Sequence, residues 1–358
     1  MDDATRTTYE ARAGEWAERR PPSLAAHAAA FSQRCLPGRP IVDLGCGPGS
    51  YFPSLGRPLV GLDGAWAMVE LAARSGPDVP VVQADLRQLP FAPLRLGGAW
   101  ARASYLHLHR HHLPVALAQL HRALAVGAPL EMTLLCGTGE GVLAEDDFPG
   151  RFFAHWQPDE LAAVVVGAGF DLDEPVGSGP SGEWLTVRAR AAPTLPDFVG
   201  PDMKVLVCGL NPSVVSAQAG FNYSGATNRF WRAAVASGLV GADRARRPLA
   251  ILAADRVGLT DLVKRATPRA DALTAAEYRD GWARIRALAA WLQPQVVLFV
   301  GLAGWRVAVD RKAQPGVQPP VPGLGQVVAY VMPSTSGLNA ATGMDALVAH
   351  MRAALAVG

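Results

Sequence analysis

Short runs rich in valine and leucine alternate with helical patterns along this 358-residue chain, and the alternation occurs twice. Apolar runs of about four to eight residues have the length of buried strands. In the first half they predict strands at 41–45, 58–62, 79–83, 97–101 and 129–135, with helices at 114–125 and 158–168. In the second half they predict strands at 204–209, 295–301 and 326–331, with helices at 227–238, 275–292 and 343–356. Such alternation is typical of parallel sheets covered by helices, so the predicted fold class is α/β.

A proline-rich segment divides the two sets of strands. Residues 191–202, AAPTLPDFVGPD, contain three prolines and no periodicity, which predicts a linker. The chain is long enough for two domains that each bury a core, so the expected domains are 1–190 and 203–358. Residues 1–202 carry 16 Lys+Arg and 23 Asp+Glu, or −7, whereas residues 203–358 carry 17 and 8, or +9. The basic half favours a polyanionic partner such as nucleic acid, although a solvated basic surface remains the alternative.

The composition argues against a membrane protein and against a disulfide scaffold. No apolar stretch reaches the roughly 18 residues of a membrane span, and the N-terminus MDDATRTTYEARAGEW is charged where a signal peptide is apolar. We therefore expect a cytoplasmic protein with no membrane partner. The cysteines show no metal-binding spacing, which predicts reduced core thiols. They are Cys35, Cys46, Cys136 and Cys208.

The first predicted strand runs into three glycines at alternate positions, in IVDLGCGPGSY at 41–51. Gly45, Gly47 and Gly49 let the backbone turn sharply and approach a ligand that any side chain would block. Asp63 ends the second strand and Asp85 follows the third, where carboxylates can bind a ribose and lie near an adenine. A glycine-rich turn alone is also compatible with a purely structural role.

Several motifs together are more specific than the turn. VDLGCGPG, GLDGAWAMVELA, QADLRQLPF, ASYLHLH and LPVALAQLHRALAVGAPLEMTLL make residues 30–190 resemble class I S-adenosylmethionine-dependent methyltransferases. The resemblance implies a Rossmann-like fold, S-adenosylmethionine as cofactor, a glycine loop for its methionine and ribose, Asp63 for the ribose and Asp85 for the adenine. The cofactor-binding residues implied are Asp43, Gly45, Gly47, Gly49, Asp63, Asp85 and Leu86.

The methyl acceptor cannot be read from this half. Methyl transfer can be driven largely by proximity and orientation, so no general base has to be visible. The one conspicuous polar cluster is LHLHRHHL, for which a pocket rim or a solvated loop is favoured over a metal site because no carboxylate or thiol is near in sequence. Its histidines are His107, His109, His111 and His112.

In the second half, the apolar run KVLVC at 204–208 stops at GLNPS, which places Asn211 at the end of a buried strand. Asn-Pro is also a good turn dipeptide. The loop that follows, AGFNYSGATNRFW, sets Phe221 and Tyr223 among glycines, a plausible pocket for a flat heterocycle. Near the C-terminus, MPSTSGLNAA places Leu338 in a polar loop, where it either packs in the core or wedges into a base step.

These motifs, with VGLTDLVKRATPRADALTAAEYRDG at 257–281, make residues 203–358 resemble the mismatch-specific uracil/thymine-DNA glycosylases. The resemblance implies that Asn211 positions the hydrolytic water and that Thr260 assists it. The base pocket it implies consists of Leu210, Ser213, Phe221 and Tyr223. The DNA wedge and the contacts to the opposite base are Ser336, Gly337, Leu338 and Asn339. Ser213 replaces the family's common glycine, and the aspartate of the more powerful uracil glycosylases is absent.

The expected chemistry follows from that absence. An amide can orient a water molecule but cannot take its proton efficiently, so the rate must come from positioning and from a base that leaves readily as an anion. Uracil and ethenocytosine fit better than thymine, the partner is double-stranded DNA with a mismatched or damaged base, and neither metal nor cofactor is expected for this half. A methyltransferase guided by a non-catalytic nucleic-acid module is the alternative. Expected phosphate contacts, some of them solvated surface, are Arg229, Arg232, Lys264, Arg265 and Arg269.

Overall fold

The structure, a computed structural model, describes residues 2–143, 145–179 and 181–358. The chain divides into two compact units. The first runs up to Val166 and includes Phe170–Ala192, and the second contains Gly167–Gly169 and Pro193–Gly358. No helix in the described part of the chain is long and apolar enough to cross a bilayer.

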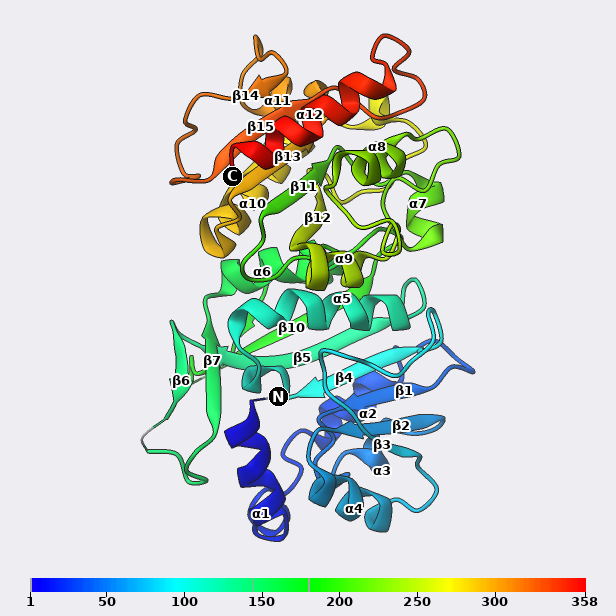
Figure 1. Ribbon diagram of the computed structural model, residues 1–358. Coiled ribbons are helices and arrows are strands. Elements are labelled where there is room, and N and C mark those ends of the chain that lie inside the picture. Colours follow the sequence, from blue (N-terminus) through cyan, green and yellow to red (C-terminus); the bar gives the residue numbers. More distant parts are fainter. Residues whose placement is uncertain (1, 144, 180) are drawn as a thin grey trace. The chain divides into compact units, whose positions relative to one another are not determined.

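The first unit is built on a largely parallel sheet (Figure 1). Its main path has the order β3-β2-β1-β4-β5-β10-β8, in which β3, β2, β1, β4 and β5 pair in parallel and β10 is antiparallel to both neighbours. The strands are β1 Ile41–Leu44, β2 Leu59–Asp63, β3 Val81–Gln83, β4 Gly98–Arg102, β5 Pro129–Cys136, β8 Phe170–Leu172 and β10 Trp184–Ala191. Off this path lie β6 Glu140–Val142, β7 Phe152–Trp156 and β9 Gly177–Ser178. Because the parallel strands point the same way, the carboxyl ends of β1, β2 and β4 meet at one edge.

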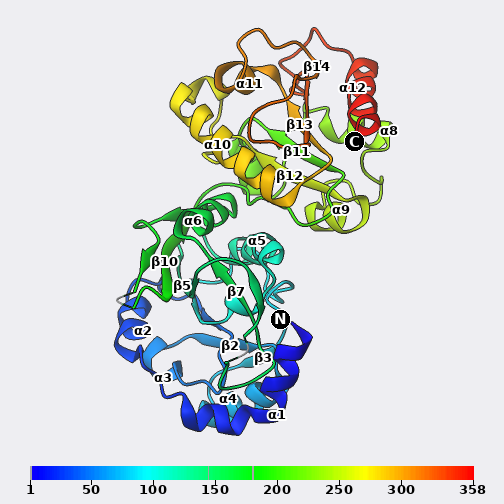
Figure 2. The ribbon, with the colours of Figure 1, turned by 90° about the vertical axis from the view of Figure 1, so that its left-hand side faces the viewer.

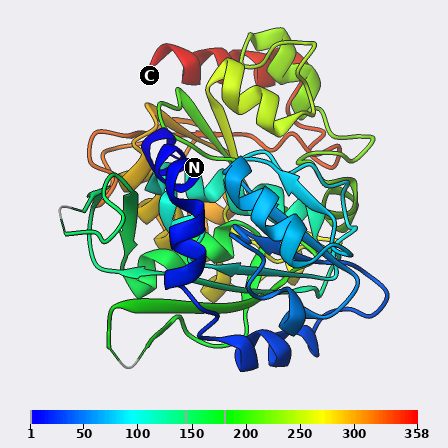
Figure 3. The ribbon, with the colours of Figure 1, turned by 90° about the horizontal axis from the view of Figure 1, so that it is seen from below.

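Helices cover this sheet. They are α1 Asp3–Arg19, α2 Ala25–Ser32, α3 Phe52–Leu55, α4 Trp66–Ser75, α5 Leu113–Ala123 and α6 Pro158–Gly167, with short 3₁₀ turns η1 Tyr105–His107 and η2 Arg110–His112. Helix α1 lies beside α4 (Figure 3), and Tyr9 and Ala13 of α1 share a buried cluster with Met68 of α4. Residue Arg12 inside α1 has non-helical backbone angles, φ −126° and ψ 22°, so the helix is kinked there.

The second unit has a five-stranded sheet of order β12-β11-β13-β15-β14, parallel except for β14. The strands are β11 Val205–Gly209, β12 Val257–Asp261, β13 Val296–Val300, β14 Gly316–Val317 and β15 Val328–Met332. Helices α10 and α11 lie on one face of the sheet and α8 and α12 on the other (Figure 2). The helices are α7 Val214–Ala219, α8 Phe230–Ser237, α9 Pro248–Asp255, α10 Ala275–Leu292, α11 Leu302–Ala308 and α12 Met344–Ala356, with a 3₁₀ turn η3 Ala270–Ala272.

The register between β11 and β12 decides which side chains share a face. Cys208 pairs with Thr260, and Gly209 pairs with Asp261. Cys208 packs in the core cluster that contains Trp282 and other α10 residues. Because successive side chains of a strand point to opposite faces, Gly209 and Asp261 face the other side, toward the loop before α8.

The predicted α/β class and the two sheets are confirmed, and the predicted helix 275–292 coincides with α10. A Thr274–Glu277 capping box fixes the start of α10. The helix predicted from 227 begins at Phe230, because the Asn228 side chain accepts a hydrogen bond from the Phe230 N–H at 3.0 Å. Strand β12, helix α1 and strand β10 were not among the predicted elements.

The expected linker 191–202 needs a correction. From Pro193 onward this segment belongs to the second unit. Phe198 exchanges backbone hydrogen bonds with Leu259, which adds a bridge beside β12. The buried carboxylate of Asp197 accepts hydrogen bonds from Thr260 and Lys264. The prolines prevent a regular strand here, but the apolar and acidic side chains between them are part of a folded core.

Candidate functional sites

A cavity of about 610 Å³ lies at the carboxyl ends of the parallel strands of the first unit. Its lining includes five residues predicted to bind a cofactor: Asp43, Gly45, Gly47, Asp63 and Leu86. Five of the seven residues predicted to bind the cofactor therefore border one cavity. The sheet edge explains why, because ligands of such sheets bind outside the carboxyl ends of the strands.

The glycine loop has the conformation that its composition predicts. Gly45 and Gly47 have φ of +69° and +54°, which L side chains rarely adopt. A Cβ on Gly45 would lie 2.4 Å from Cβ of Ser104, so any side chain there would displace the neighbouring wall. The backbone N–H of Gly47 donates to Oδ2 of Asp63 at 2.9 Å. The turn after β1 is therefore tied to the carboxylate that ends β2.

Two buried polar atoms in this wall have no hydrogen-bond partner among the described residues, Oδ2 of Asp43 and Oγ of Ser104. Burial, and then the charge of Asp63, raise the pKa of Asp43 to about 8. Burial also raises the pKa of Asp63, against the hydrogen bonds from the N–H groups of Ala65 and Gly47. The unpaired acceptors beside a glycine-rich turn suit a ligand that carries both an amine and hydroxyl groups, as S-adenosylmethionine does.

Two of the predicted cofactor residues are not among those that line the cavity. A Cβ on Gly49 would lie 2.7 Å from Oγ of Ser75, so this glycine serves close packing against α4. The carboxylate of Asp85 accepts hydrogen bonds from the N–H and the guanidinium of Arg87 at 2.8–2.9 Å. Burial acts to raise the pKa of Asp85, but the Arg87 hydrogen bonds outweigh it and lower the pKa. The ionised Asp85 is thus engaged by Arg87, whereas the next residue, Leu86, reaches the cavity.

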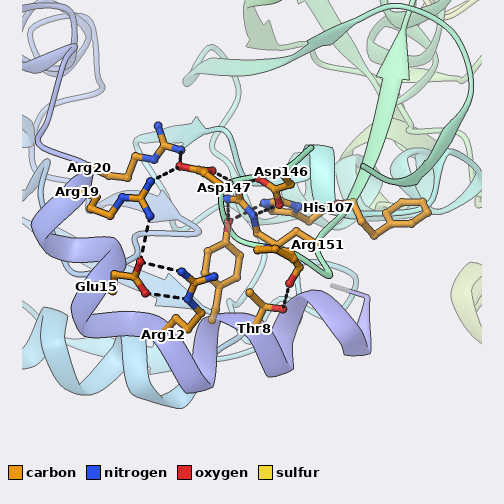
Figure 4. A network of polar contacts seen from close by, with 12 residues as sticks. Thr8, Arg12, Glu15, Arg19, Arg20, His107, Asp146, Asp147 and Arg151 are labelled. Atoms are coloured by element: carbon orange, nitrogen blue, oxygen red, sulfur yellow. Dashed lines mark hydrogen bonds and ion pairs between the residues drawn. The ribbon is translucent and has the colours of Figure 1, made fainter. Parts of the chain in front are cut away.

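Tyr9 and Trp16 of helix α1 line one side of the cavity, a role that the sequence did not reveal. Figure 4 shows the contacts that Arg19 and Arg20, at the end of α1, make with Asp147. The hydroxyl of Tyr9 lies 2.9 Å from Nε2 of His107, and Nδ1 of His107 lies 2.7 Å from the carbonyl oxygen of Phe152. A carbonyl only accepts, so Nδ1 carries the proton and Nε2 accepts from Tyr9. Arg151 donates to the same hydroxyl at 3.1 Å. Burial is the main reason that the pKa of His107 is lowered to about 4, so the imidazole is neutral.

The histidine cluster of the sequence is divided by the fold. His107 is buried at the cavity wall, whereas His109, His111 and His112 contact one another through their rings. Among the described residues, no three His, Cys, Asp or Glu side chains gather in a way that could hold a metal ion. The cluster therefore contributes one residue to the cavity and three to a neighbouring loop.

In the second unit, the side chain of Asn211 is held in one orientation. Its Nδ2 donates to the carbonyl oxygen of Arg265 at 3.0 Å and to Oγ1 of Thr267 at 2.8 Å. The carbonyl partner decides the assignment of the amide, because a carbonyl can accept but cannot donate. Thr267 in turn donates to the carbonyl oxygen of Arg269 at 2.8 Å. Oδ1 of Asn211 has no donor among the described residues, so it is available to a water molecule or a ligand.

Thr260 does not join Asn211. It is 1% exposed, and its hydroxyl donates to Oδ1 of Asp197 at 2.7 Å on the α10 face of the sheet. Arg284 and Lys264 also bind Asp197. Burial alone would raise the pKa of Asp197, but the charges of Arg284 and Lys264 outweigh it and lower the pKa. The residue that orients Asn211 is Thr267. It lies in the motif KRATPRA, but nothing in that motif indicated this role.

The next residue along β12, Asp261, faces the side where the base pocket was expected, and no sequence motif had indicated it. It is 3% exposed, and its Oδ2 accepts a 2.9 Å hydrogen bond from Nδ2 of Asn222. Burial raises the pKa of Asp261 to about 6, against the charge of Lys264. Oδ1 of Asp261 lies 2.3 Å from where a Cβ on Gly209 would be, and the Tyr223 hydroxyl lies 3.1 Å from the same point. A side chain at position 209 would therefore collide with the Asp261 carboxylate and crowd the Tyr223 hydroxyl.

The predicted base-pocket residues have different surroundings. Tyr223 is stacked on Phe230 with ring centroids 3.9 Å apart and planes at 18°, so one face of its ring is covered. Ser213 is the N-cap of α7, and its hydroxyl accepts from the N–H of Ser216 at 3.1 Å. Leu210 packs against the core cluster on the α10 side, and Phe221 is partly exposed. Serine in place of glycine at 213 thus has a local structural reason.

The loop after β15 displays its leucine as the wedge interpretation requires. Leu338 is 89% exposed. The Asn339 side chain donates within the loop, to the carbonyl oxygen of Ser334 at 2.8 Å and to Oγ1 of Thr342 at 3.1 Å. A Cβ on Gly337 would lie 2.6 Å from Oγ1 of Thr227, so the loop can sit this close only with glycine.

Arg229, expected to bind phosphate, instead fastens this loop. Its guanidinium donates to the carbonyl oxygens of Ser336 at 3.1 Å and Asn339 at 2.7 Å, and also to that of Thr342. Lys264 is likewise committed, to the buried ion pair with Asp197 at 2.8 Å. Arg265 pairs with Glu277, and Arg269 pairs with Asp271 on the surface. Of the five predicted phosphate contacts, Arg232 is exposed with no ion pair among the described residues.

Comparison with known proteins assigns each unit. The family model of the uracil DNA glycosylase superfamily matches residues 196–356, and a methyltransferase domain model matches residues 41–127. The CcbJ methyltransferase of Streptomyces caelestis is 20% identical, with 54% of this chain and 100% of that chain covered and a TM-score of 0.44. A S-adenosylmethionine-dependent methyltransferase of Methanosarcina mazei is 15% identical, with 46% and 97% covered and a TM-score of 0.40.

Both TM-scores are below 0.5, so the family models carry the assignment. The glycosylase match begins at residue 196, close to the division at Pro193, and the methyltransferase match lies within the first unit. The chain therefore joins a methyltransferase domain to a domain of the uracil DNA glycosylase superfamily.

Proposed function

We propose that the second domain is a monofunctional DNA glycosylase that hydrolyses the N-glycosidic bond of uracil and related bases opposite guanine, as in base excision repair. The observation that carries this proposal is the orientation of Asn211 by Arg265 and Thr267, which leaves Oδ1 free to hold a water molecule. The exposed Leu338 supports it, because an apolar side chain fixed at the tip of a polar loop suits insertion into a base stack.

The chemistry follows from the type of group at the strand end. Glycosidic cleavage passes through a positively charged, oxocarbenium-like sugar. The Asn211 amide orients the attacking water but accepts no proton, so the reaction depends on the stability of the departing base anion. Mismatched bases are extruded at lower free-energy cost than paired ones, which favours G·U over A·U. Uracil and ethenocytosine should therefore be released faster than thymine.

A lyase activity is not expected. The chain has three lysines, and the one near the Asn211 segment, Lys264, is held in the ion pair with Asp197. A Schiff base needs a free amine, so trapping with borohydride should yield no covalent DNA adduct.

The first domain is proposed to bind S-adenosylmethionine. Asp43, Gly45, Gly47, Asp63 and Leu86 would hold the cofactor, which supplies an electrophilic methyl group. The chain's own contribution is to enclose the site, with α1 covering it and the neutral His107 keeping the Tyr9 hydroxyl in place.

The test is cleavage of labelled oligonucleotides at abasic sites, with G·U, G·T, G·ethenocytosine, A·U and single-stranded uracil as substrates. We expect G·U and G·ethenocytosine to be opened and Asn211→Ala to abolish opening. Gln314→Ala, an exposed amide variant of the same domain, is the matched control and should behave as wild type. Binding to mismatched DNA without base release, together with methyl incorporation into nucleic acid, would favour a methyltransferase guided by a non-catalytic domain.

A further inference from the structure

Two polar atoms next to the end of β11 are buried without a hydrogen-bond partner among the described residues, the hydroxyl oxygen of Tyr223 and Oδ1 of Asn222. A buried polar atom without a partner loses its hydrogen bonds to water and gains none in return, so native folds keep few of them. These two lie in one loop, directly before α8. Their position next to the strand that presents Asn211 indicates a ligand rather than a packing accident.

The Tyr223 ring packs against α8. Its ring stacks on Phe230 and meets Trp231 edge to face, with planes at 76°. Trp231 Nε1 donates to the carbonyl oxygen of Asn222 at 2.9 Å, which fastens the loop to α8. Tyr223 also has φ of +57°, a left-handed conformation that is uncommon for an aromatic residue. A strained residue held by its surroundings is typical of functional sites.

The hydroxyl and Oδ1 of Asp261 both lie close to the backbone of Gly209, at the end of β11. Both atoms are within about 3 Å of where a Gly209 Cβ would be, so the two groups can approach the strand end this closely because position 209 has no side chain. Nδ2 of Asn222 is used by Asp261, which leaves Oδ1 of Asn222 as an acceptor. Together the three side chains offer one hydrogen-bond donor, the phenol of Tyr223, and two acceptors, Oδ1 of Asn222 and Oδ1 of Asp261.

We infer that Tyr223 donates a hydrogen bond to a carbonyl oxygen of the extruded pyrimidine and thereby stabilises the base as it departs. The inference rests on the proposed glycosylase activity. A uracil edge presents a carbonyl next to an N–H, which matches the phenol donor next to the acceptors of Asn222 and Asp261. The role of Tyr223 is then exerted by its hydroxyl, since one face of the ring is already covered by Phe230.

The step balances without a further reactant. The bond between C1′ of the sugar and N1 of the base breaks, and its electron pair passes to the base and spreads onto the carbonyl oxygens. The oxygen of the water held by Asn211 bonds to C1′, and the proton that this water loses goes to solvent. Once the base is in place, a donor held at an oxygen where negative charge develops lowers the barrier. Burial, with the charge of Asp261 adding to it, raises the pKa of Tyr223, so the phenol keeps its proton.

Access requires a movement of the loop. The Tyr223 hydroxyl and Asn222 Oδ1 are shielded from solvent in the free protein, so a base reaches them only when the 220–229 loop shifts. Glycines at 220 and 225 bracket the polar part of this loop. Closure on a correct base would then engage the donor only after extrusion, which adds selectivity.

The experiment compares Tyr223→Phe with wild type in single-turnover release of uracil and of 5-fluorouracil opposite guanine. Tyr223→Phe removes the donor and keeps the stacked ring. Loss of one such donor typically lowers the rate by about 10²–10³-fold, and we expect a loss of this order for uracil. The loss should be several-fold smaller for 5-fluorouracil, because fluorine already stabilises the base anion. Tyr330→Phe is the control, since that hydroxyl contacts His350 at 2.9 Å, and should leave both rates unchanged.

An unchanged uracil rate in Tyr223→Phe would overturn the inference. An equal loss on both substrates, with a lowered melting temperature, would also overturn it, because it would indicate a packing role. If wild-type protein releases neither base, the proposed function itself fails, and that failure is visible before any variant is made.

Discussion

The Asn211 amide and the Thr267 hydroxyl are joined by a 2.8 Å hydrogen bond, and Thr267 is itself fixed by donating to the carbonyl oxygen of Arg269. This pair determines which way the free oxygen of Asn211 points. Replacing Thr267 by valine removes the acceptor and allows the amide to rotate. We expect Thr267→Val to lower the single-turnover rate of uracil release by about tenfold, the effect of roughly one lost hydrogen bond, with DNA affinity unchanged. Thr267→Ser should restore the rate.

For Thr260 we expect a substitution to change the stability of the domain and not its rate of uracil release. Its hydroxyl donates to Asp197 within a buried ion network, away from Asn211. Thr260→Val should lower stability by about 1–3 kcal/mol, because an acceptor in the network loses a donor. The rate per folded molecule should stay within a few-fold of wild type. A rate loss as large as that of Asn211→Ala, with stability unchanged, would assign Thr260 to catalysis after all.

Arg229 should act through the loop that carries Leu338. Its guanidinium donates to three carbonyl oxygens of that loop, and an uncharged replacement leaves them without this donor. We expect Arg229→Met to reduce uracil release from duplex DNA by more than tenfold and release from single strands by much less, since single strands need no wedge. Equal losses on both substrates would instead indicate a phosphate contact. Arg232→Met, at an exposed neighbouring position, should weaken binding to both and reduce its salt dependence.

The buried carboxyl of Asp43 makes the first domain sensitive to pH. Its pKa is raised to about 8 from 3.8, so the folded state binds the proton more tightly than the unfolded state. Its contribution to stability is thus full below about pH 4 and declines as the pH rises toward 8. The melting temperature of the first domain should show this decline, and Asp43→Asn should flatten it. Calorimetry can identify that transition by its shift when S-adenosylmethionine is added.

The cover of the cofactor cavity is fastened by exposed ion pairs. Arg19 and Arg20 at the end of α1 both contact Asp147, beyond the kink at Arg12. Exposed pairs are worth about 0–1 kcal/mol each and are screened by salt. Asp147→Asn should therefore accelerate S-adenosylmethionine release several-fold at low salt and less at high salt, measured by stopped-flow fluorescence. Asp78→Asn, which removes the exposed pair with Arg57, is the matched control and should have no effect.

The sequence was sufficient for the α/β class and for residues whose role depends on the backbone. The turn glycines Gly45 and Gly47, and Asn211 at a strand end, lie where their local patterns predict them. It was not sufficient for side-chain partners that come from distant segments. Thr260 was expected to assist Asn211, but its hydroxyl donates to Asp197, and the hydroxyl that meets the Asn211 amide belongs to Thr267, in the loop after β12.

The partners of charged residues were likewise not predictable from the sequence. Arg229 and Lys264 look like surface cations in sequence, yet one holds a loop and the other forms a buried ion pair. Helix α1 was missed because its role at the cavity depends on Tyr9, whose partners His107 and Arg151 are about 100 residues or more away. Periodicity reports burial, and it does not report which buried groups meet.

The most direct measurement is single-turnover release of uracil from a G·U duplex by the whole chain and by Asn211→Ala. We expect release by wild type, leaving an alkali-sensitive abasic site, and a loss of at least about 10²-fold in the variant. Release that persists unchanged in Asn211→Ala would contradict the assignment of the site. Absence of release by folded, mismatch-binding wild-type protein would contradict the proposed activity.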